Sequence, residues 1–434
     1  MKNVKYPPIL HWEVTPNCNH NCIHCYNYWR RDCECIRVEK NNALIDYAKK
    51  IVDLKPVAVV VTGGEPLLVF NELKESLLLL KNNGIIVSIN SNASLVSDEI
   101  AIFLAKNRIS LFVSFPCSKP DICDYITNIE GSFDKITKGI LKLNEHGVKF
   151  SVNMVVSKKN LPYIFSSAKY AKEKLGVNRF FASRVSKPVN ATETFDTELL
   201  SKDEIELMLS ELCRIKKELS MEISTGAPIP ACLITNHNLF NEFAYKKTCT
   251  AGRFSYCIDS LGNVKACVRD SNIYGNILTE SFSEIWNKMK DWKNDIFVPT
   301  DCKKCEKLFL CRTGCRMESV PFTHKLDCMD TAARTENLPI KYENPTILEK
   351  QYDKEQDFCV YPTMNLVKED FGYRLNCFAQ YTYITFQFGE FLKENKEFNI
   401  TKICNIFNQD YKTVNSLINK LIEKQIIYEK RIRK

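Results

Sequence analysis

The sequence predicts an α/β fold built on parallel strands, and three observations support this prediction. Between residues 9 and 183, short apolar runs of strand length alternate with longer segments of helical period. Glycines such as Gly176 stand between helical segments and the strands that follow, where a left-handed residue commonly ends a helix. The strand–helix units number six, too few to close an eight-stranded barrel. We therefore expect a partial (β/α)6 TIM-like barrel.

The individual elements of this barrel follow from the apolar periodicity. The expected strands are residues 10–14, 57–62, 85–90, 109–115, 148–156 and 178–182. The expected helices are residues 41–54, 72–82, 97–106, 133–145, 161–175 and 202–219. Because such strands run parallel, their C-terminal ends meet at one edge, which is where the active sites of barrels lie.

The rest of the chain differs from the barrel in composition. We expect a barrel domain, a small cysteine-rich domain, a polar linker and a C-terminal winged-helix-like domain at residues 1–235, 236–334, 335–357 and 358–434, respectively. The C-terminal domain has strand candidates at residues 359–365 and 373–377, then helical segments at 384–393, 400–408 and 411–424. The cysteine-rich domain has little apolar pattern, so bound metal would have to stabilise it.

Composition indicates a cytoplasmic enzyme that binds metal. The first residues lack the apolar segment of a signal peptide, and nowhere do about 18 uncharged apolar residues follow one another. A membrane partner is therefore not expected. Since the cytosol keeps thiols reduced, the 20 cysteines point to metal rather than disulfides. The net charge of +8 is too small, over 434 residues, to name an acidic partner.

Three cysteines, Cys18, Cys22 and Cys25, follow the first expected strand within a few residues of one another. Three thiolates can bind three irons of a cubane [4Fe–4S] cluster, so that the fourth iron stays open for another ligand. This C-x3-C-x2-C spacing resembles the signature of the radical S-adenosylmethionine (SAM) superfamily. Thr62-Gly-Gly-Glu-Pro66, after the second strand, resembles the GGEP motif of the same superfamily. The alternative is a structural zinc site next to an unrelated Gly-Gly turn.

The resemblance implies a set of residues that bind SAM. Tyr26 would flank the adenine, and the Gly63-Gly64-Glu65 segment would bind the amino group of SAM. Further contacts are expected from later strand ends, at Asn92, Ser114, Asn153 and Arg184, although each could equally serve its local backbone. The segment from Ser114 to Cys117 departs from the Ser-x-Asp-Gly of many relatives. Cys117 is a candidate catalytic residue, a thiol at the barrel mouth that could donate a hydrogen atom to a substrate radical.

A second set of cysteines lies between residues 249 and 328. Its spacing resembles the SPASM extension of radical SAM enzymes, with Cys249, Cys267, Cys302, Cys305, Cys311, Cys315 and Cys328 matching the seven cysteines of that pattern. The resemblance implies that Cys302, Cys305, Cys311 and Cys328 hold one auxiliary [4Fe–4S] cluster. Cys249, Cys267 and Cys315 would hold another, whose fourth iron is bound by Cys257 or left open. Zinc ribbons are the alternative for the whole set, and a buried strand thiol is the alternative for Cys257.

The other cysteines have no such pattern. Most of them are expected to be small buried hydrophobic residues: Cys33, Cys35, Cys123, Cys213, Cys232, Cys359, Cys377 and Cys404.

Residues 358–430 resemble, in pattern, the small winged-helix domain that recognises leader peptides in pathways of ribosomally synthesised, modified peptides (RiPPs). Such a domain adds an extended peptide to a sheet edge. The combined resemblance implies an oxidoreductase that contains three [4Fe–4S] clusters and receives electrons from flavodoxin or ferredoxin. It would cleave SAM reductively and use the 5′-deoxyadenosyl radical to abstract hydrogen from a ribosomal precursor peptide. The product would be a thioether or carbon–carbon crosslink, with an auxiliary cluster accepting the surplus electron.

Two other kinds of function remain open on the sequence. A sulfatase-maturing enzyme or an enzyme of a haem or quinone cofactor pathway would share the first 330 residues but would not need a peptide-binding domain. An iron–sulfur redox-sensing regulator would use the winged helix on DNA instead. The expected recognition helix at residues 411–424 contains lysines but no arginine, so nucleic acid is not the expected partner.

Overall fold

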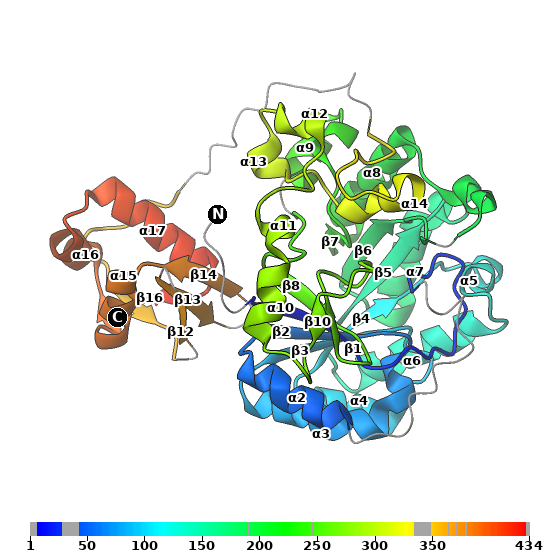
Figure 1. Ribbon diagram of the computed structural model, residues 1–434, viewed down its shortest axis with the longest axis horizontal. Helices are drawn as coiled ribbons and strands as arrows, with labels where there is room; N and C mark the ends of the chain where they lie inside the picture. Colours follow the sequence, from blue (N-terminus) through cyan, green and yellow to red (C-terminus); the bar gives the residue numbers. More distant parts are fainter. Residues whose placement is uncertain are drawn as a thin grey trace. The chain divides into compact units, whose positions relative to one another are not determined.

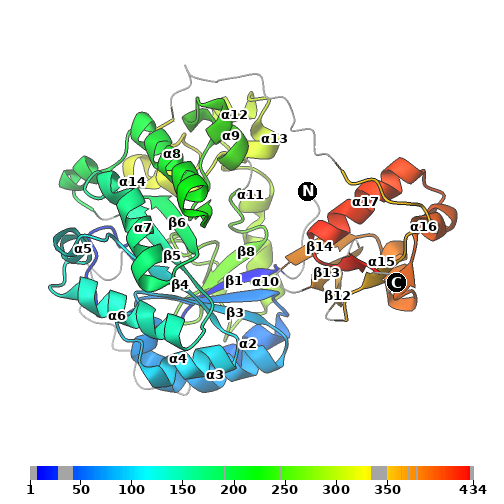
Figure 2. The ribbon, with the colours of Figure 1, turned by 180° about the vertical axis from the view of Figure 1, so that it is seen from behind.

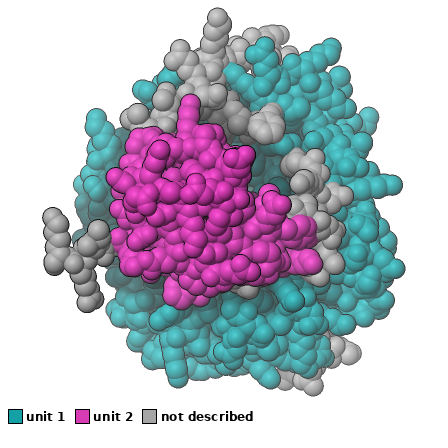
Figure 3. Space-filling model, turned by 90° about the vertical axis from the view of Figure 1, so that its left-hand side faces the viewer, with its two compact units in different colours: residues 1, 7–342 teal, residues 2–6, 343–434 magenta. Residues whose placement is uncertain are grey.

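The chain forms two compact units (Figure 3). A computed structural model describes residues 7–27, 43–189, 191–244 and 247–333 of unit 1, and 349–362, 364–369, 372–377 and 380–430 of unit 2. Cys33, Cys35 and the first part of the expected linker lie outside the described residues. No described helix is long and apolar enough to span a bilayer.

Unit 1 is built on a parallel sheet that contains the six expected strands (Figure 1). These are β1 (Ile9–Glu13), β2 (Ala58–Thr62), β3 (Ile86–Ser91), β4 (Ser110–Ser114), β5 (Phe150–Val156) and β6 (Arg179–Arg184). Each pairs in parallel with the next, so their order in the sheet is their order in the sequence. The predicted α/β fold with a parallel sheet is thereby confirmed.

Helices connect these strands, as the periodicity predicts. They are α2 (Ala43–Asp53), α3 (Phe70–Asn82), α4 (Asp98–Lys106), α5 (Pro120–Thr127), α6 (Ser132–Glu145), α7 (Ile164–Leu175) and α8 (Lys202–Leu219). Figures 1 and 2 show α2, α3, α4 and α6 along one face of the sheet. The ends of the helices have local causes: Ser201 and Glu204 form a capping box at the start of α8, and Gly176 ends α7 with a left-handed φ of 68°.

The sheet extends beyond the predicted strands at both sides. On one side β7 (Glu222–Thr225) pairs in parallel with β6. On the other side β8 (Ser255–Ile258) pairs in parallel with β1 and forms a hairpin with β9 (Asn263–Lys265), which is followed by β10 (Gly275–Asn276). Among the described strands the two ends of the sheet, β7 and β10, do not pair with each other, so the sheet is open.

The cysteine-rich region shares its hydrophobic core with the strands of the sheet. Side chains of β8, β9 and α10 (Phe282–Lys288), including Tyr256, Val264 and Trp286, are buried in the same cluster as Leu10 and Val59. The sequence predicted a hairpin in this region, but the parallel pairing of β8 with β1 was not predicted. Apolar packing, and not metal alone, therefore holds the start of this region in place.

Unit 2 has a hydrophobic core of its own, formed by residues such as Phe358, Leu375, Leu392 and Ile418. Its elements are β11 (Phe358–Val360), β12 (Asn365–Glu369), β13 (Gly372–Cys377), β14 (Gln380–Ile384), α15 (Phe386–Glu394), β15 (Glu397–Phe398), α16 (Ile400–Phe407), α17 (Tyr411–Glu423) and β16 (Ile427–Glu429). Strands β12, β13 and β14 form an antiparallel meander, and β11 lies between β15 and β16 in a second sheet. The three expected helices are present. The single strand expected at residues 359–365 is replaced by β11 and β12, and β14 was not predicted.

Candidate functional site

The first group of cysteines lies on a loop that follows β1 directly. We call residues 15–27 the cysteine loop; Cys18, Cys22 and Cys25 are all half-buried on it. Backbone N–H groups of Asn21 and Ile23 donate hydrogen bonds of 3.0 Å to Thr127 and Ile126, at the end of α5. The loop is therefore attached to the body of the unit between its cysteines.

The Gly63–Glu65 segment, which follows β2, fixes the start of the same loop. The backbone N–H groups of Gly64 and Glu65 donate hydrogen bonds of 2.7 Å to the carbonyl oxygens of Thr15 and Asn17. A Cβ atom on Gly64 would lie only 1.8 Å from the carbonyl oxygen of Asn17. The sequence predicted that glycine here would let the backbone approach a ligand. The structure shows that glycine first of all lets it approach the cysteine loop.

Glu65 joins this segment to the end of β3. Its carboxylate is 1% exposed and accepts hydrogen bonds from the Ser91 hydroxyl (2.8 Å) and from the backbone N–H groups of Asn92 (2.8 Å) and Leu67 (3.0 Å). Burial raises the pKa of Glu65 to about 7, although these three hydrogen bonds act in the opposite direction. The Asn92 side chain in turn donates to Asn19 Oδ1 at 2.9 Å, so the end of β3 contacts the cysteine loop.

The other predicted SAM contacts lie at neighbouring strand ends. The Tyr26 hydroxyl is 3.5 Å from Thr62 Oγ1, which places Tyr26 beside the Gly63–Gly64 segment. Ser114 is exposed at the end of β4 and is paired in register with Asn153 on β5. The Asn153 side chain accepts a hydrogen bond of 2.7 Å from Ser183. Tyr26, Gly63, Gly64, Glu65 and Asn92 are thus gathered at the cysteine loop, and Ser114 and Asn153 lie together on the next strands.

Arg184 is held by partners that the sequence did not suggest. Its guanidinium is buried and forms an ion pair with Asp330 and a second with Glu318 at 3.6 Å. Both carboxylates come from the cysteine-rich region, so Arg184 links β6 to that region. The guanidinium of Arg184 is thus already bound by two carboxylates, and its contact with SAM stays a prediction.

Cys117 follows the C-terminal end of β4, as the sequence predicted, but it is buried. It is 0% exposed and belongs to the hydrophobic core of unit 1. Its sulfur accepts hydrogen bonds from the backbone N–H of Lys119 (3.5 Å) and the hydroxyl of Ser167 (3.8 Å), and burial raises its pKa. In this structure the thiol packs as a small buried residue, so its catalytic role stays a prediction.

Cys249, Cys267 and Cys315 form one group in the cysteine-rich region. Burial is the main reason why the pKa of Cys267 is raised, and the charges of Asp270, Cys315 and Cys249 add to it. Burial likewise raises the pKa of Cys315 to about 11, although Arg269, whose guanidinium lies 3.7 Å from the sulfur, lowers it. Arg269 is therefore placed to compensate negative charge at this group.

Cys257, the possible fourth ligand of that group, is fully buried in β8. It is paired in register with Lys265, which forms a buried ion pair of 2.7 Å with Glu13. Burial raises the pKa of Cys257 well above its usual range, and the charge of Glu13 acts in the same direction. The thiol thus lies inside the sheet beside an ion pair.

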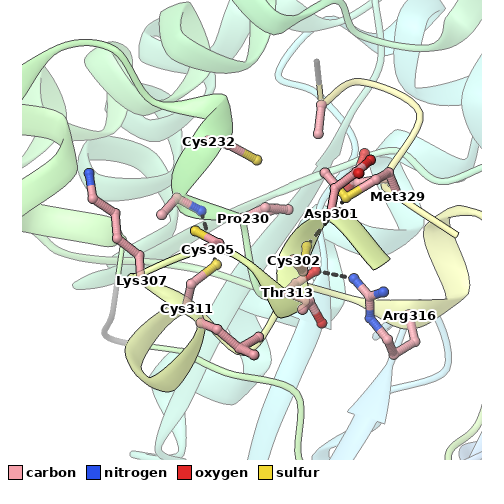
Figure 4. Close-up of a pocket in the computed structure, with 14 residues that line it drawn as sticks. Pro230, Cys232, Asp301, Cys302, Cys305, Lys307, Cys311, Thr313, Arg316 and Met329 are labelled. Carbon is pink, nitrogen blue, oxygen red and sulfur yellow. Dashed lines mark hydrogen bonds between the residues drawn. The ribbon is translucent and has the colours of Figure 1, made fainter. Parts of the chain in front are cut away.

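A second group of cysteines surrounds a cavity of about 50 Å³, which we call the cysteine cavity (Figure 4). Cys302, Cys305 and Cys311 line it, as predicted for one auxiliary cluster, together with Asp330. The fourth thiol in the lining is Cys232, which the sequence analysis counted among the buried hydrophobic residues. Cys328, the predicted fourth ligand, is not among the described residues that line the cavity.

The electrostatics of Cys232 agree with this position. Burial raises the pKa of Cys232 to about 12, and the charges of Cys311 and Cys302 contribute further. Nothing in the spacing of the sequence marked Cys232, because it lies 70 residues or more before the others. Among the described residues no three His, Cys, Asp or Glu side chains are gathered closely enough to hold a single metal ion. A cubane, by contrast, holds each thiolate on a different iron.

Comparisons with known proteins identify the class of both cysteine regions. A sequence model of the radical SAM superfamily matches residues 12–161, and a model of the SPASM iron–sulfur cluster-binding domain matches residues 249–312. The AdoMet-dependent heme synthase of Methanosarcina barkeri is 26% identical over 340 residues, 73% of this chain and 93% of that protein. A cysteine-type anaerobic sulfatase-maturating enzyme of Clostridium novyi is 26% identical over 335 residues, 71% of this chain and 87% of that protein.

Solved structures show the same fold. Streptococcus suis SuiB bound to S-adenosylmethionine has a TM-score of 0.60 and 17% identity, covering 76% of this chain and 78% of that chain. SuiB has also been solved bound to its precursor peptide SuiA. The chain therefore contains a radical SAM region at residues 12–161 and a SPASM iron–sulfur cluster-binding region at residues 249–312. It is an enzyme for which these two regions indicate [4Fe–4S] clusters and SAM as cofactors.

The residues present fit such clusters. The cysteine loop supplies three thiols, and its start is contacted by Gly64 and Glu65. The cysteine cavity supplies four more. Arg316 also lines this cavity; its side chain is buried, and its Nε atom has no hydrogen-bond partner among the described residues. Thiolates around an unsatisfied guanidinium N–H suit an anionic iron–sulfur group.

Proposed function

We propose that the enzyme modifies a ribosomal precursor peptide and closes a thioether or carbon–carbon crosslink in it. The observation that carries this proposal is unit 2, a compact body in which a three-stranded antiparallel meander, β12–β13–β14, precedes three helices, α15, α16 and α17. An outer strand of such a meander can accept an extended peptide as a further strand, and a neighbouring helix can bind its side chains. SuiB, which binds a precursor peptide, supports the same partner.

In this proposal Cys18, Cys22 and Cys25 bind the cluster that acts on SAM. When bound, this cofactor pair supplies an electron to SAM and a 5′-deoxyadenosyl radical that abstracts hydrogen from an unactivated C–H bond. The chain positions the pair: backbone hydrogen bonds from Gly64 and Glu65 hold the cysteine loop. Glu65, through Asn92, fixes the end of β3 beside the loop. Flavodoxin or ferredoxin is the proposed electron donor.

The sequence suggests eight SAM contacts, and we keep all of them except the last: Tyr26, Gly63, Gly64, Glu65, Asn92, Ser114, Asn153 and Arg184. For Glu65 we propose a mainly indirect role, because three donors inside the protein already bind its carboxylate. For Arg184 we propose a structural role in place of a SAM contact, because two carboxylates occupy its guanidinium.

The SPASM region would hold two further clusters, which brings the proposed total to three. Cys249, Cys267 and Cys315 would bind one of them, with Cys257 or an open site at the fourth iron. Cys302, Cys305 and Cys311 would bind the other, with Cys328 as the fourth ligand by resemblance. These clusters would lie in the same unit as the cysteine loop, which suits the removal of the electron that crosslinking releases.

The experiment is an anaerobic assay with the full chain, SAM, a reductant and short peptides encoded by neighbouring reading frames. We expect 5′-deoxyadenosine together with a peptide that has lost the mass of two hydrogens for each crosslink. A chain that ends at residue 348 should still cleave SAM, but it should modify the peptide about a hundredfold more slowly or worse. The leader would then no longer raise the local concentration of the peptide at the site.

The separate unit tests the regulator alternative. Residues 349–434, which contain a core of their own, should bind the leader peptide and show no sequence-selective DNA binding. Sequence-selective DNA binding, or a truncated enzyme that modifies peptide at the full rate, would overturn the proposed recognition.

A second candidate function is favoured by the relatives named above. A heme synthase and a sulfatase-maturating enzyme cover most of the same length of chain, so a porphyrin or a protein cysteine could be the substrate instead. The same assay with iron coproporphyrin or a sulfatase-derived peptide separates these outcomes, because each product has its own mass change.

A further inference from the structure

The cysteine cavity contains one thiol that no part of the SPASM resemblance assigns. Cys232 lies on the short helix η4 (Ala231–Leu233), between β7 and α9 (His237–Phe243), and therefore before the SPASM region begins. It lines the cavity with Cys302, Cys305 and Cys311, and Figure 4 shows the four side chains around one opening. This arrangement rests on tertiary contacts of η4.

Two contacts fix η4 against the segment that carries Cys311. The backbone N–H of Ala231, the residue before Cys232, donates a hydrogen bond of 3.3 Å to the sulfur of Cys311. On the other side, Pro230 packs so tightly on Gly314 that a Cβ at Gly314 would lie 2.5 Å from Pro230 Cγ. Cys232 is therefore held beside Cys311 by its neighbours in the chain, and a small rotation of a loop would not remove it.

Cys328 is placed differently. Its backbone carbonyl accepts a hydrogen bond of 3.3 Å from Arg316 Nη1, and its side chain is not part of the described cavity lining. The next residue, Met329, does line the cavity, and its sulfur lies 3.3 Å from that of Cys302. Met329 and Cys232 thus line the cavity together with Cys302, whereas Cys328 does not.

The cavity also carries positive charge. Arg316 and Lys307 line it beside the carboxylates of Asp301 and Asp330, and Asp330 is already ion-paired with Arg184. The buried Nε of Arg316 has no hydrogen-bond partner among the described residues. A cubane with four thiolates is anionic, and hydrogen bonds to its sulfurs stabilise it. The cavity volume of about 50 Å³ is several times what one water molecule requires.

We propose that Cys232, in place of Cys328, supplies the fourth thiolate of the cluster held by Cys302, Cys305 and Cys311. This inference rests on the proposed function only in requiring that the SPASM region hold iron–sulfur clusters. On binding, the Cys232 thiol releases its proton to solvent and its sulfur donates an electron pair to the fourth iron, with no change in oxidation state. The cluster is thereby tied to unit 1 outside the SPASM segment.

The test compares Cys232→Ala with Cys328→Ala in the full chain, after anaerobic reconstitution. For Cys232→Ala we expect the EPR signal of one reduced auxiliary cluster to change its g values or to disappear, while the signal of the SAM-binding cluster stays. For Cys328→Ala we expect auxiliary spectra like those of the wild type. Cys213→Ala, a half-buried cysteine of α8 outside the cavity lining, is the matched control and should leave all spectra unchanged.

A measurement on the wild-type chain avoids the risk that a variant fails to fold. Iodoacetamide should label Cys232 at least tenfold more slowly in the reconstituted protein than after removal of iron by a chelator, as read by mass spectrometry of its peptide. Equal labelling in both states, or a Cys232→Ala spectrum that superimposes on that of the wild type while Cys328→Ala changes it, overturns the inference. In that case the proposed function still stands. Wild-type protein that binds iron only at the cysteine loop overturns both.

Discussion

The cysteine loop and the cysteine cavity supply thiols for the same kind of cofactor but are assembled in different ways. In the loop, Cys18, Cys22 and Cys25 lie on one short segment that follows β1 directly. In the cavity, one thiol comes from η4 and the other three come from α12 (Thr300–Lys303), α13 (Leu308–Cys311) and the turn between these two helices. Cys232 and Cys311 are 79 positions apart in the sequence. Local spacing identifies the first site, whereas only packing between distant segments forms the second.

The two sites also differ in what supports them. The loop is held by backbone hydrogen bonds with the segment after β2 and with the end of α5, and by neutral side chains such as Asn19 and Asn27. The cysteine-rich region is held by buried arginines: Arg269 on Glu318 at 2.6 Å, Arg184 on Asp330, and Arg316 on backbone carbonyls. We therefore expect the loop to be sensitive to backbone changes and the cysteine-rich region to be sensitive to the removal of charge.

The largest effect should come from removing the thiols of either site. Alanine at Cys18, Cys22 and Cys25 together should remove about four irons per chain and all detectable 5′-deoxyadenosine formation, since the cysteine loop carries the cluster that we propose acts on SAM. Alanine at Cys302, Cys305 and Cys311 should also remove about four irons but leave SAM cleavage detectable. Iron analysis and chromatography of 5′-deoxyadenosine check both. Loss of SAM cleavage in both variants would contradict the separation of the two sites.

Gly64→Ala should damage the loop through its backbone alone. The added Cβ would meet the carbonyl oxygen of Asn17 at 1.8 Å, and such overpacking costs about 1–3 kcal/mol of stability. We expect a lower unfolding midpoint and less iron at the SAM-binding cluster, measured by EPR. Gly84→Ala is the control: unlike Gly64, Gly84 has a positive φ, of 74°, and its Cβ would meet nothing within 4 Å, so we expect a loss of about 1 kcal/mol and normal iron. Equal iron loss in both variants would contradict the argument that the close approach of Gly64 to Asn17 holds the cysteine loop.

Arg184→Gln should act on the cysteine-rich region. It leaves the buried carboxylate of Asp330 without its ion pair, while Glu318 keeps the one with Arg269; removal of a buried partner costs about 3–5 kcal/mol. The dissociation constant of SAM should stay within about twofold of the wild-type value, below 0.5 kcal/mol. Arg179→Gln, on the same strand but in an exposed ion pair with Glu222, should cost less than about 1 kcal/mol. A large rise in the SAM dissociation constant with normal stability would instead make Arg184 a SAM contact.

The smallest effect is expected for Cys257→Ala. Because this thiol is buried in β8 beside the ion pair of Glu13 and Lys265, its removal should cost about 1 kcal/mol and leave the auxiliary spectra unchanged. EPR of the reduced protein and thermal unfolding measure the two effects. A changed spectrum or potential of one auxiliary cluster would assign Cys257 as the fourth ligand of the group with Cys249, Cys267 and Cys315.

The sequence by itself determined what depends on near neighbours in the chain. The six strands β1–β6 and their helices, except α5, were predicted within a few residues. Helix α8 was predicted at its observed bounds, residues 202–219, because apolar periodicity and caps act over one or two turns. The thiols of the cysteine loop were predicted for the same reason. The three helices of unit 2 were predicted as well. Strand β14 was not predicted, because its residues, Gln380–Ile384, have mixed polarity.

The tertiary structure alone decided which distant segments meet. The parallel pairing of β8 with β1, the ion pair between Arg184 and Asp330 and the entry of Cys232 into the cysteine cavity join residues from 70 to 246 positions apart. The surroundings of Cys117 were likewise not predictable from nearby residues, since its sulfur accepts a hydrogen bond from Ser167, fifty positions further on. Such contacts form when whole elements bury their apolar faces together. This free energy is shared over many side chains, so no single spacing in the sequence records it.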